Sequence, residues 1–381
     1  MRVLFSFVGG MGHGDPLLPI AAASEAAGHT VAFVCRPSSA PSVESAGFTV
    51  FPTGVSGRDT RSPLVAPDAA LEEQVLLDWH ADRVARQRAT AVFELIETWR
   101  PDVIVRDEAD FGCAVAAERL GVSCATVLVI ASGSFLRPEL LADRLDVLRA
   151  EHGLAPDPLL HALQRDLVVA PFPPSFRDPA FPLPPTAHSI RPATLGIRPD
   201  GQVPAWLSAL YGKPTIYFTL GTEFNLESGD LFTRVVSGLR QLPVNVVVTV
   251  GHGIDPAELG PQPANVHIEQ YIPQSMLLPR CDLAVSHAGS GSVIGALAHG
   301  LPSVLLPMGA DQLHNTIRCE QLGVGRALDV MTATPSDVRD TAASLMEDAA
   351  ARRCAERIGD EARALPGADS VVVRLEQLAP D

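Results

Sequence analysis

The order of apolar runs and glycine turns at the start of the chain constrains its fold more than any other feature. Residues 2–8 are a short run rich in Val and Phe. A glycine-rich turn, a helical stretch over 17–27 and a second apolar run over 30–35 follow. Short runs of β-branched and aromatic residues that alternate with helical stretches are typical of buried parallel strands. This order predicts the beginning of a doubly wound α/β domain.

The same alternation continues along the chain and resumes after a gap. In the first half we expect strands at 102–107, 124–130 and 167–170 and helices at 72–99, 111–120 and 139–165. In the second half we expect strands at 215–221, 244–251, 267–272, 282–289 and 303–308, and helices at 231–241, 292–299 and from 335 onward. The pattern therefore predicts two similar α/β sets.

A proline-rich stretch separates the two sets. Residues 171–204 contain 10 prolines, a density that breaks regular structure and indicates an interdomain connection. We predict one domain over 1–190 with a linker to about 205, a second over 206–365, and a C-terminal helix over 366–381 that packs near the first domain. Two such halves imply a cleft, and ligands of these sheets bind beyond the carboxyl ends of the strands.

Composition excludes several classes of protein. The chain is 46% hydrophobic and 19% charged, so each half can bury a core and a disordered chain is excluded. A net charge of −15 argues against a nucleic-acid partner. The six cysteines are scattered without metal-ligand spacing, which predicts free thiols in a reducing compartment. We find no secretory signal and no apolar stretch of roughly 18–20 residues, so we expect a cytoplasmic protein without stable membrane insertion.

His13 stands in the turn GGMGHGDP, which follows the first expected strand. Catalytic groups collect at the carboxyl ends of strands in this architecture, and the flanking glycines leave the imidazole uncrowded. Either a catalytic base or a histidine bonded to a local carbonyl fits this position. A dinucleotide-dependent oxidoreductase is disfavoured, because Asp15 replaces the third glycine of the fingerprint and the second strand ends in Cys35 and Arg36, without an acidic residue.

Asp107 ends the expected strand 102–107. A carboxylate there could reach His13, hold one tautomer of the ring and stabilise the imidazolium when His13 takes a proton. The alternative is an N-cap for the next helix, a role open to Asp107, Glu108 or Asp110.

Two loops of the second half carry polar residues suited to an anionic sugar donor. The sequence HAGSGS from His287 to Ser292 joins a strand to a helix, where backbone N–H groups and the helix dipole favour negative charge. Asp311 and Gln312 follow the strand 303–308, and their side chains can accept and donate hydrogen bonds to hydroxyl groups. The alternatives are a plain turn with a serine cap and a solvated loop.

With these motifs the chain resembles the inverting GT-B glycosyltransferases of the UDP-glycosyltransferase superfamily, and most closely the bacterial enzymes that glycosylate natural products. The similarity spans nearly the whole chain and is strongest from His267 to Gly325, the donor-binding signature. The resemblance implies two doubly wound Rossmann-like domains that face each other across a cleft. The first would bind a small hydrophobic acceptor, such as a polyketide or antibiotic aglycone, and the second a nucleotide-sugar donor.

The resemblance also assigns roles. His13 matches the base that deprotonates the acceptor, and Asp107 matches its partner carboxylate. The matching donor residues are Gly221 and Thr222 near the phosphates, Tyr271, Ile272 and Gln274 at the nucleotide base, His287, Gly289, Ser290, Gly291 and Ser292 at the pyrophosphate, and Asp311 and Gln312 at the sugar. The candidate residues for the acceptor pocket, which we expect between about 55 and 150, are Trp79, Phe111, Phe135 and Leu136. Plain core packing is the alternative role for these four.

One departure from the family concerns the donor. Many relatives have a glutamate eight residues after the position of His287, where it binds ribose hydroxyls, and here that residue is Gly295. We take this to favour a deoxyribose donor, a dTDP-sugar, over a UDP-sugar. The chain has no DxD motif, so we expect single in-line displacement with inversion and neither metal nor other cofactor.

Other functions and assemblies stay open at this point. A nucleotide-sugar 2-epimerase and a catalytically inactive accessory protein for a partner glycosyltransferase are the alternative functions on the same fold. A homodimer is compatible with the sequence.

Overall fold

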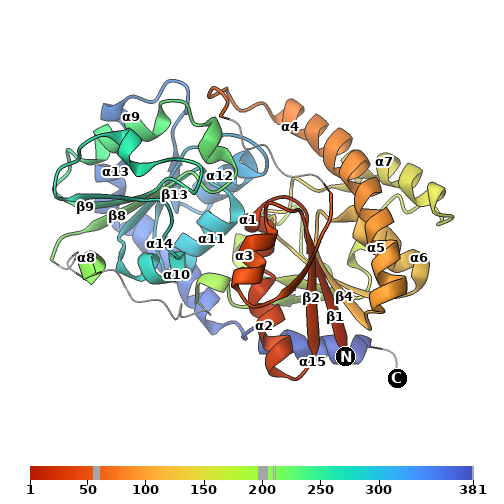
Figure 1. The fold of residues 1–381 in the computed structure, drawn as a ribbon. Helices are drawn as coiled ribbons and strands as arrows, with labels where there is room; N and C mark the ends of the chain where they lie inside the picture. The colour runs from red at the N-terminus through yellow and green to blue at the C-terminus, as the bar shows by residue number, and fades with distance from the viewer. Residues whose placement is uncertain (55–60, 196–204, 209, 211, 380–381) are drawn as a thin grey trace. The chain divides into compact units, whose positions relative to one another are not determined.

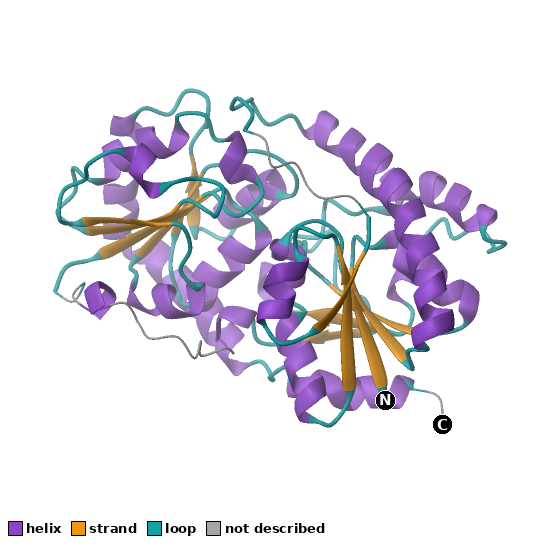
Figure 2. Ribbon diagram, viewed as in Figure 1, coloured by secondary structure: helices purple, strands orange, loops and turns teal. Residues whose placement is uncertain are grey.

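The structure, a computed structural model, describes residues 1–54, 61–195, 205–208, 210 and 212–379. The chain divides into two compact units, each with a central sheet flanked by helices (Figures 1 and 2). Unit 1 comprises Met1–Arg58, Ala70–Ala193 and Leu365–Asp381, and unit 2 comprises Asp59–Ala69 and Thr194–Ala364. Among the described residues no helix is both long and apolar enough to cross a membrane.

Unit 1 is built on a seven-stranded parallel sheet with the order β3-β2-β1-β4-β5-β6-β7. Its strands are β1 (Arg2–Ser6), β2 (Thr30–Cys35), β3 (Thr49–Pro52), β4 (Val103–Asp107), β5 (Ser123–Val127), β6 (Leu167–Ala170) and β7 (Ala187–Ser189). Its helical segments are α1 (Met11–Gly14), α2 (Leu18–Ala26), α3 (Ala40–Ser45), α4 (Ala69–Val75), the π-helical η1 (Leu76–Val84), α5 (Ala85–Trp99), α6 (Phe111–Leu120), α7 (Pro138–Glu151), η2 (His161–Gln164), η3 (Pro174–Phe176) and α15 (Asp369–Leu378).

Unit 2 repeats this plan with a six-stranded parallel sheet of order β10-β9-β8-β11-β12-β13. Its strands are β8 (Thr215–Thr219), β9 (Asn245–Thr249), β10 (Val266–Glu269), β11 (Leu283–Ser286), β12 (Ser303–Leu305) and β13 (Gly325–Ala327). Its helical segments are η4 (Ala193–Leu195, at the junction with unit 1), α8 (Ala205–Ser208), η5 (Phe224–Glu227), α9 (Leu231–Leu239), η6 (Pro256–Leu259), α10 (Gln274–Leu277), η7 (Leu278–Arg280), α11 (Ser290–Ala298), α12 (Gln312–Gln321), α13 (Pro335–Glu347) and α14 (Ala349–Ala364). The predicted pair of doubly wound α/β domains is confirmed.

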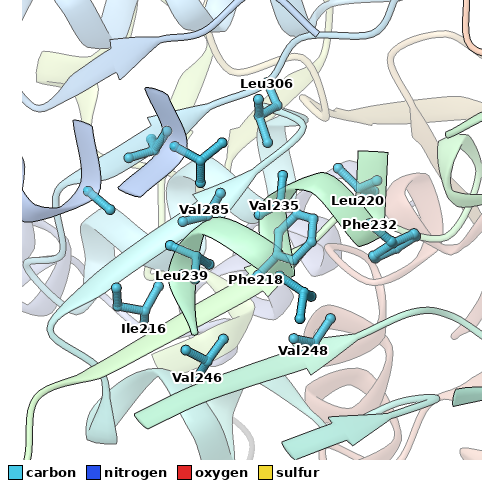
Figure 3. Close-up of a cluster of buried hydrophobic side chains, with 14 of the residues drawn as sticks. Ile216, Phe218, Leu220, Phe232, Val235, Leu239, Val246, Val248, Val285 and Leu306 are labelled. Atoms are coloured by element: carbon cyan, nitrogen blue, oxygen red, sulfur yellow. The ribbon is translucent and has the colours of Figure 1, made fainter. Parts of the chain in front are cut away.

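Each sheet is buried on both faces, as the apolar runs predict. In unit 2, Phe218, Val285 and Leu306 lie in one fully buried cluster beneath α9 (Figure 3). In unit 1, Phe5 stacks on Phe33 with ring centroids 5.1 Å apart. Such packing removes large apolar surfaces from water, which is the main force that holds the sheets and helices together.

The C-terminal helix α15 belongs to unit 1. It packs against α2, and its Val371 and Leu375 are buried in the same apolar cluster as Phe5 and Phe33. The chain therefore returns to its first unit after completing the second.

Residues 61–69, which we placed in the first domain, group instead with unit 2. The backbone N–H of Ser62 donates to the carbonyl of Leu226 at 3.1 Å, and Leu64 packs against the core of unit 2. Arg61 forms an ion pair with Glu258 at 2.6 Å. These contacts join residues far apart in sequence, which explains why the sequence did not reveal them.

Two expected boundaries in unit 1 were wrong. The helix expected over 139–165 ends at Glu151, because Gly153 takes a left-handed φ of 70° and closes the helix with its own N–H and that of Leu154. The proline-rich stretch contains β7, which we expected to be irregular. Proline is tolerated near β7 because this strand is at the edge of the sheet.

Candidate functional site

His13 lies on α1, the short helix directly after β1. Two glycines make room around it. Gly9 has a φ of 73°, and a Cβ atom at this position would lie 3.4 Å from Cδ2 of His13. A Cβ atom at Gly14 would lie 2.8 Å from the ring of Phe7. The glycine-rich turn therefore lets α1 sit closely on the end of β1, with His13 still 28% exposed.

Asp107 lies at the end of β4, the strand that pairs with β1. Its carboxylate is fully buried and accepts hydrogen bonds from the backbone N–H groups of Val8 and Ala109, each at 2.6 Å. Oδ1 of Asp107 lies 3.5 Å from Nδ1 of His13. The structure thus brings together the two residues that we predicted as base and partner carboxylate.

The capping role that could have explained Asp107 belongs to a neighbour. Asp110 is the N-cap of α6, since its Oδ1 accepts from the backbone N–H of Cys113 at 3.1 Å. Its Oδ2 accepts from the hydroxyl of Ser6 at 2.6 Å. Glu108 points elsewhere and accepts from backbone N–H groups in the loop after β5.

A second histidine, His80, interacts electrostatically with His13 and Asp107, and our sequence reasoning missed it. His80 lies on η1 and is half-buried. Burial lowers its pKa to about 4, the neighbouring His13 lowers this pKa further, and the carboxylate of Asp107 raises it. The charges of both residues therefore influence the protonation of His80. No motif marks it, because a single histidine within a helical stretch has no distinctive sequence pattern.

The acceptor residues that we predicted occupy two different environments. Phe111 and Phe135 are 1% and 7% exposed in one apolar cluster, and Leu136 packs against that cluster. Core packing accounts for these positions. Trp79 is 39% exposed on η1, and the guanidinium of Arg83 lies 4.9 Å from its ring centroid. An acceptor-binding role for these four residues stays a prediction.

His287 follows β11 in unit 2 and is held between two glycines. A Cβ atom at Gly221 would lie 2.6 Å from its ring, and one at Gly289 would lie 2.5 Å from its Nε2. Only glycine leaves space for the imidazole at both positions. Thr222 is exposed beside Gly221.

The environment of His287 keeps its ring neutral. The residue is 9% exposed, and burial lowers its pKa to about 4. Its Nδ1 is buried and makes no hydrogen bond with the described residues. At neutral pH the ring can therefore donate an N–H to an anion, but it carries no positive charge.

Helix α11 begins next to this ring. Its first residues, Ser290, Gly291 and Ser292, carry backbone N–H groups that lack acceptors within the helix, as at every helix N-terminus. Such a terminus favours bound phosphate. The preceding Ala288 has a φ of 68°, a left-handed conformation that non-glycine residues rarely adopt and that is frequent at ligand sites.

Asp311 is held by a buried network. Its Oδ2 accepts from the hydroxyl of Ser290 at 2.6 Å and from the amide of Asn315 at 2.7 Å. Asn315 is fully buried and also donates to the carbonyl of Ala288 at 3.0 Å. The network ties the α11 turn to the loop before α12. Asn315 was missed by the sequence analysis, although its spacing of four residues from Asp311 on a helix was a usable signal.

Gln312 supports the same loop from inside. It is 1% exposed, and its Oε1 accepts from the backbone N–H groups of Met308 and Gly309 at 2.7 and 3.2 Å. The Oε1 atom of Gln312, which we expected at the sugar, therefore accepts its hydrogen bonds from the loop itself. The expected contact with the sugar stays a prediction for the amide nitrogen alone.

The predicted nucleotide-base segment presents one exposed ring. Tyr271 is 56% exposed, and its ring stacks at 5.6 Å on that of His252, whereas Ile272 is a core residue. Gln274 fills the space at the position of the missing glutamate. A Cβ atom at Gly295 would lie 2.7 Å from its Oε1.

Comparisons with known proteins give one consistent result. Residues 233–378 match the family model described as erythromycin biosynthesis protein CIII-like, C-terminal domain. The chain is 29% identical to 4'-demethylrebeccamycin synthase of Lentzea aerocolonigenes, with 94% of this chain and 95% of that protein covered. It is 28% identical to the TDP-daunosamine transferase DnrS of Streptomyces peucetius, with 99% and 97% covered.

The fold matches that of solved glycosyltransferases. The spinosyn rhamnosyltransferase SpnG in complex with thymidine diphosphate superposes with a TM-score of 0.82 at 24% identity, covering 99% of this chain and 100% of that one. Together these matches confirm the resemblance to bacterial natural-product glycosyltransferases of the GT-B fold.

Proposed function

From this similarity along its whole length to GT-B glycosyltransferases, we propose that the chain transfers a sugar, in particular a deoxysugar, from a dTDP-sugar to a hydroxyl group of a small apolar natural product. The transfer inverts the anomeric carbon and needs no metal. The observation that carries the proposal is the pair of His13 and Asp107, with Nδ1 and Oδ1 at 3.5 Å.

The pair fits a general base. Because Nδ1 of His13 faces the carboxylate of Asp107, the tautomer with a proton on Nδ1 leaves the lone pair of Nε2 for the acceptor hydroxyl. As the acceptor oxygen bonds to the anomeric carbon, its proton passes to Nε2 and the bond from that carbon to the diphosphate breaks. The buried carboxylate of Asp107 then stabilises the imidazolium.

The donor loops of unit 2 fit the leaving group. The diphosphate gains negative charge as the bond breaks, and the N-terminus of α11 offers backbone N–H groups beside it. His287 adds an N–H donor from a neutral ring. Fixed dipoles of this kind stabilise developing charge without reorganising during the reaction.

Two observations support a dTDP donor. One relative is described as a TDP-daunosamine transferase, and one solved relative of the same fold holds thymidine diphosphate. In addition, the space at Gly295 is filled by the amide of Gln274, so no carboxylate stands there for a ribose 2′-hydroxyl. A deoxyribose has no such hydroxyl to satisfy.

A thermal-shift panel with dTDP, UDP, GDP and NAD tests the donor. A ligand at 100 times its Kd should stabilise the protein by about 2.7 kcal/mol. We expect a rise in Tm with dTDP alone. A rise with UDP alone would remove the dTDP assignment, and no rise with any nucleotide would favour an inactive accessory protein.

Product analysis tests the reaction. We expect the wild type to form a glycoside with inverted anomeric configuration, seen by NMR, equally with and without EDTA. A donor epimerised in the absence of acceptor would instead identify a 2-epimerase.

A further inference from the structure

Arg88 of α5 is a buried cation that contacts the beginning of the loop leading to His13. Its side chain is 5% exposed, and arginine is rarely buried to this extent unless it is paired. Nη2 donates to the carbonyl of Phe7 at 2.9 Å, and Nη1 donates to the hydroxyl of Thr53. Nε lies 3.4 Å from Oδ2 of Asp110. The guanidinium therefore joins the three segments that follow β1, β3 and β4.

A close approach of two helices brings Arg88 to Asp110. α5 and α6 pack backbone to backbone at Gly112, where a Cβ atom would lie 2.1 Å from the carbonyl oxygen of Ala85 and 2.7 Å from the backbone nitrogen of Ala89. A larger residue would push the two helices apart. Because Arg88 precedes Ala89 on α5 and Asp110 caps α6, this contact sets the guanidinium against the cap.

One peptide group links Arg88 to the carboxylate of Asp107. The carbonyl of Phe7 and the N–H of Val8 belong to the same planar peptide group. Arg88 donates to that carbonyl at 2.9 Å, and the N–H donates to Oδ2 of Asp107 at 2.6 Å. Hydrogen bonds arranged in such a chain polarise and strengthen one another. The peptide group is therefore held from both sides, by the guanidinium and by the carboxylate that faces His13.

A second link passes through Asp110. Its backbone N–H donates to the carbonyl of Asp107 at 3.2 Å, and its carboxylate accepts from the hydroxyl of Ser6 at 2.6 Å. Asp107 and Asp110 are both fully buried, and two buried anions within one turn repel each other. The cation of Arg88 offsets this repulsion.

We propose that Arg88 is a positioning residue for the transfer reaction, which fixes the carboxylate of Asp107 against His13 through the peptide group between Phe7 and Val8. This inference rests on the proposed function. Because Arg88 is buried, it acts on the reaction through the pair of His13 and Asp107. Its loss should therefore lower kcat and leave the KM for donor and acceptor unchanged.

The test compares Arg88→Lys and Arg88→Met with the wild type. Lysine keeps the charge, but its single nitrogen cannot replace three nitrogens in a planar fork. The probes are dTDP-glucose as donor and 10-deoxymethynolide or 4-methylumbelliferone as acceptor, whichever the wild type glycosylates. We expect kcat to fall about 10-fold in Arg88→Lys and about 100-fold in Arg88→Met, because a misplacement of about 1 Å can cost 100-fold in rate.

Arg149→Lys and Arg149→Met are the matched controls. Arg149 is also a buried arginine of unit 1, 7% exposed, and it pairs with Glu118 at 2.6 Å. These variants should keep the wild-type kcat even where their Tm falls as far as that of the Arg88 variants. Equal losses of kcat in Arg88→Lys and Arg149→Lys would overturn the inference.

A double-mutant cycle shows whether Arg88 acts through His13. In a His13→Ala background, Arg88→Lys should lower kcat no further, because residues that act as one unit are not additive. A further 10-fold loss in the double variant would overturn the inference.

A measurement without substrate completes the test. ¹⁵N NMR spectra of histidine-labelled protein show which ring nitrogen of His13 carries the proton, with its signals identified by their loss in His13→Ala. We expect the proton on Nδ1 in the wild type and in Arg149→Lys, and a mixture of tautomers in Arg88→Lys. Unchanged His13 signals in a folded Arg88→Lys variant would overturn the inference. No glycoside from the wild type with either acceptor would contradict the proposed function, and the spectra would still decide the role of Arg88.

Discussion

The two units place a histidine at the carboxyl end of a strand in the same type of sheet, yet the two rings are suited to different chemistry. His13 faces the buried carboxylate of Asp107 at 3.5 Å and is 28% exposed. His287 has no carboxylate partner among the described residues and is enclosed by Gly221 and Gly289. One ring can accept a proton and be stabilised as a cation, whereas the other stays neutral.

This difference shows that the surroundings of each ring, and not the architecture, decide its role. Both sheets follow the strand order of a doubly wound fold, so the strand ends provide equivalent positions. A carboxylate stabilises a cationic imidazolium, and desolvation opposes it. The proposed function accordingly assigns acid–base chemistry to unit 1 and anion binding to unit 2.

Replacing His13 should give the largest loss of activity, and it tests whether the ring of unit 1 is the one that accepts a proton. We expect His13→Ala to lower kcat about 1000-fold, since general-base catalysis contributes 10²- to 10⁴-fold. Initial rates of glycoside formation measure this. His29→Ala is the control, because His29 bonds Glu376 of α15 at 3.0 Å and lies outside the site, so its kcat should not change. A His13→Ala variant within tenfold of the wild type would show that another group removes the proton.

Replacing Asp107 separates its effect on His13 from its backbone hydrogen bonds. Asp107→Asn should lower kcat about 100-fold, because the imidazolium loses its carboxylate. Asp157→Asn is the matched control, since Asp157 also accepts from two backbone N–H groups, those of His161 and Ala162 at 3.0 and 2.7 Å. Equal losses of activity in the two variants would assign Asp107 a purely structural role.

The neutral state of His287 should be visible in the pH dependence of stability. The pKa of His287 is about 4 in the folded protein and about 6.5 in the unfolded chain, so the unfolded state binds more protons between these values. The contribution of His287 to the unfolding free energy is therefore complete above pH 6.5 and falls by about 3 kcal/mol as the pH drops to 4. Urea unfolding at pH 7.5, 6 and 5 should show a shallower fall for His287→Gln than for the wild type. Parallel curves would mean that the ring is protonated in the fold.

Substituting a glycine next to the ring of His287 should give the smallest effect, a change in the unfolding free energy. Gly289→Ala should lower the unfolding free energy by about 1–3 kcal/mol, because its Cβ would lie 2.5 Å from Nε2 of the ring. Gly291→Ala is the control for stability. A Cβ there meets no atom within 4 Å, and alanine favours the helix by up to about 1 kcal/mol over glycine. Equal stability of the two variants would show that the ring is not confined.

The sequence predicted most strands and the ends at which polar residues gather. Prediction from the sequence failed where segments that are distant in the chain contact each other. The stretch 61–69 joins unit 2 through contacts such as the hydrogen bond from Ser62 to Leu226. The helix expected over 72–99 contains a π-helical segment that local propensity does not encode. The spacing of four residues between Asp311 and Asn315 was visible in the sequence, but the hydrogen bond from Asn315 to Ser290 joins segments 25 residues apart.

The sequence by itself determined the order of strands, glycine turns and helices, because hydrophobic period and glycine positions act over a few residues. It also placed His13, Asp107 and His287 at strand ends. Only the tertiary structure decided that Asp107 faces His13 and that Asp110 caps the helix instead. It also decided that burial keeps His287 neutral. The physical reason is that protonation and pairing depend on desolvation and on neighbours that packing brings together from distant parts of the chain.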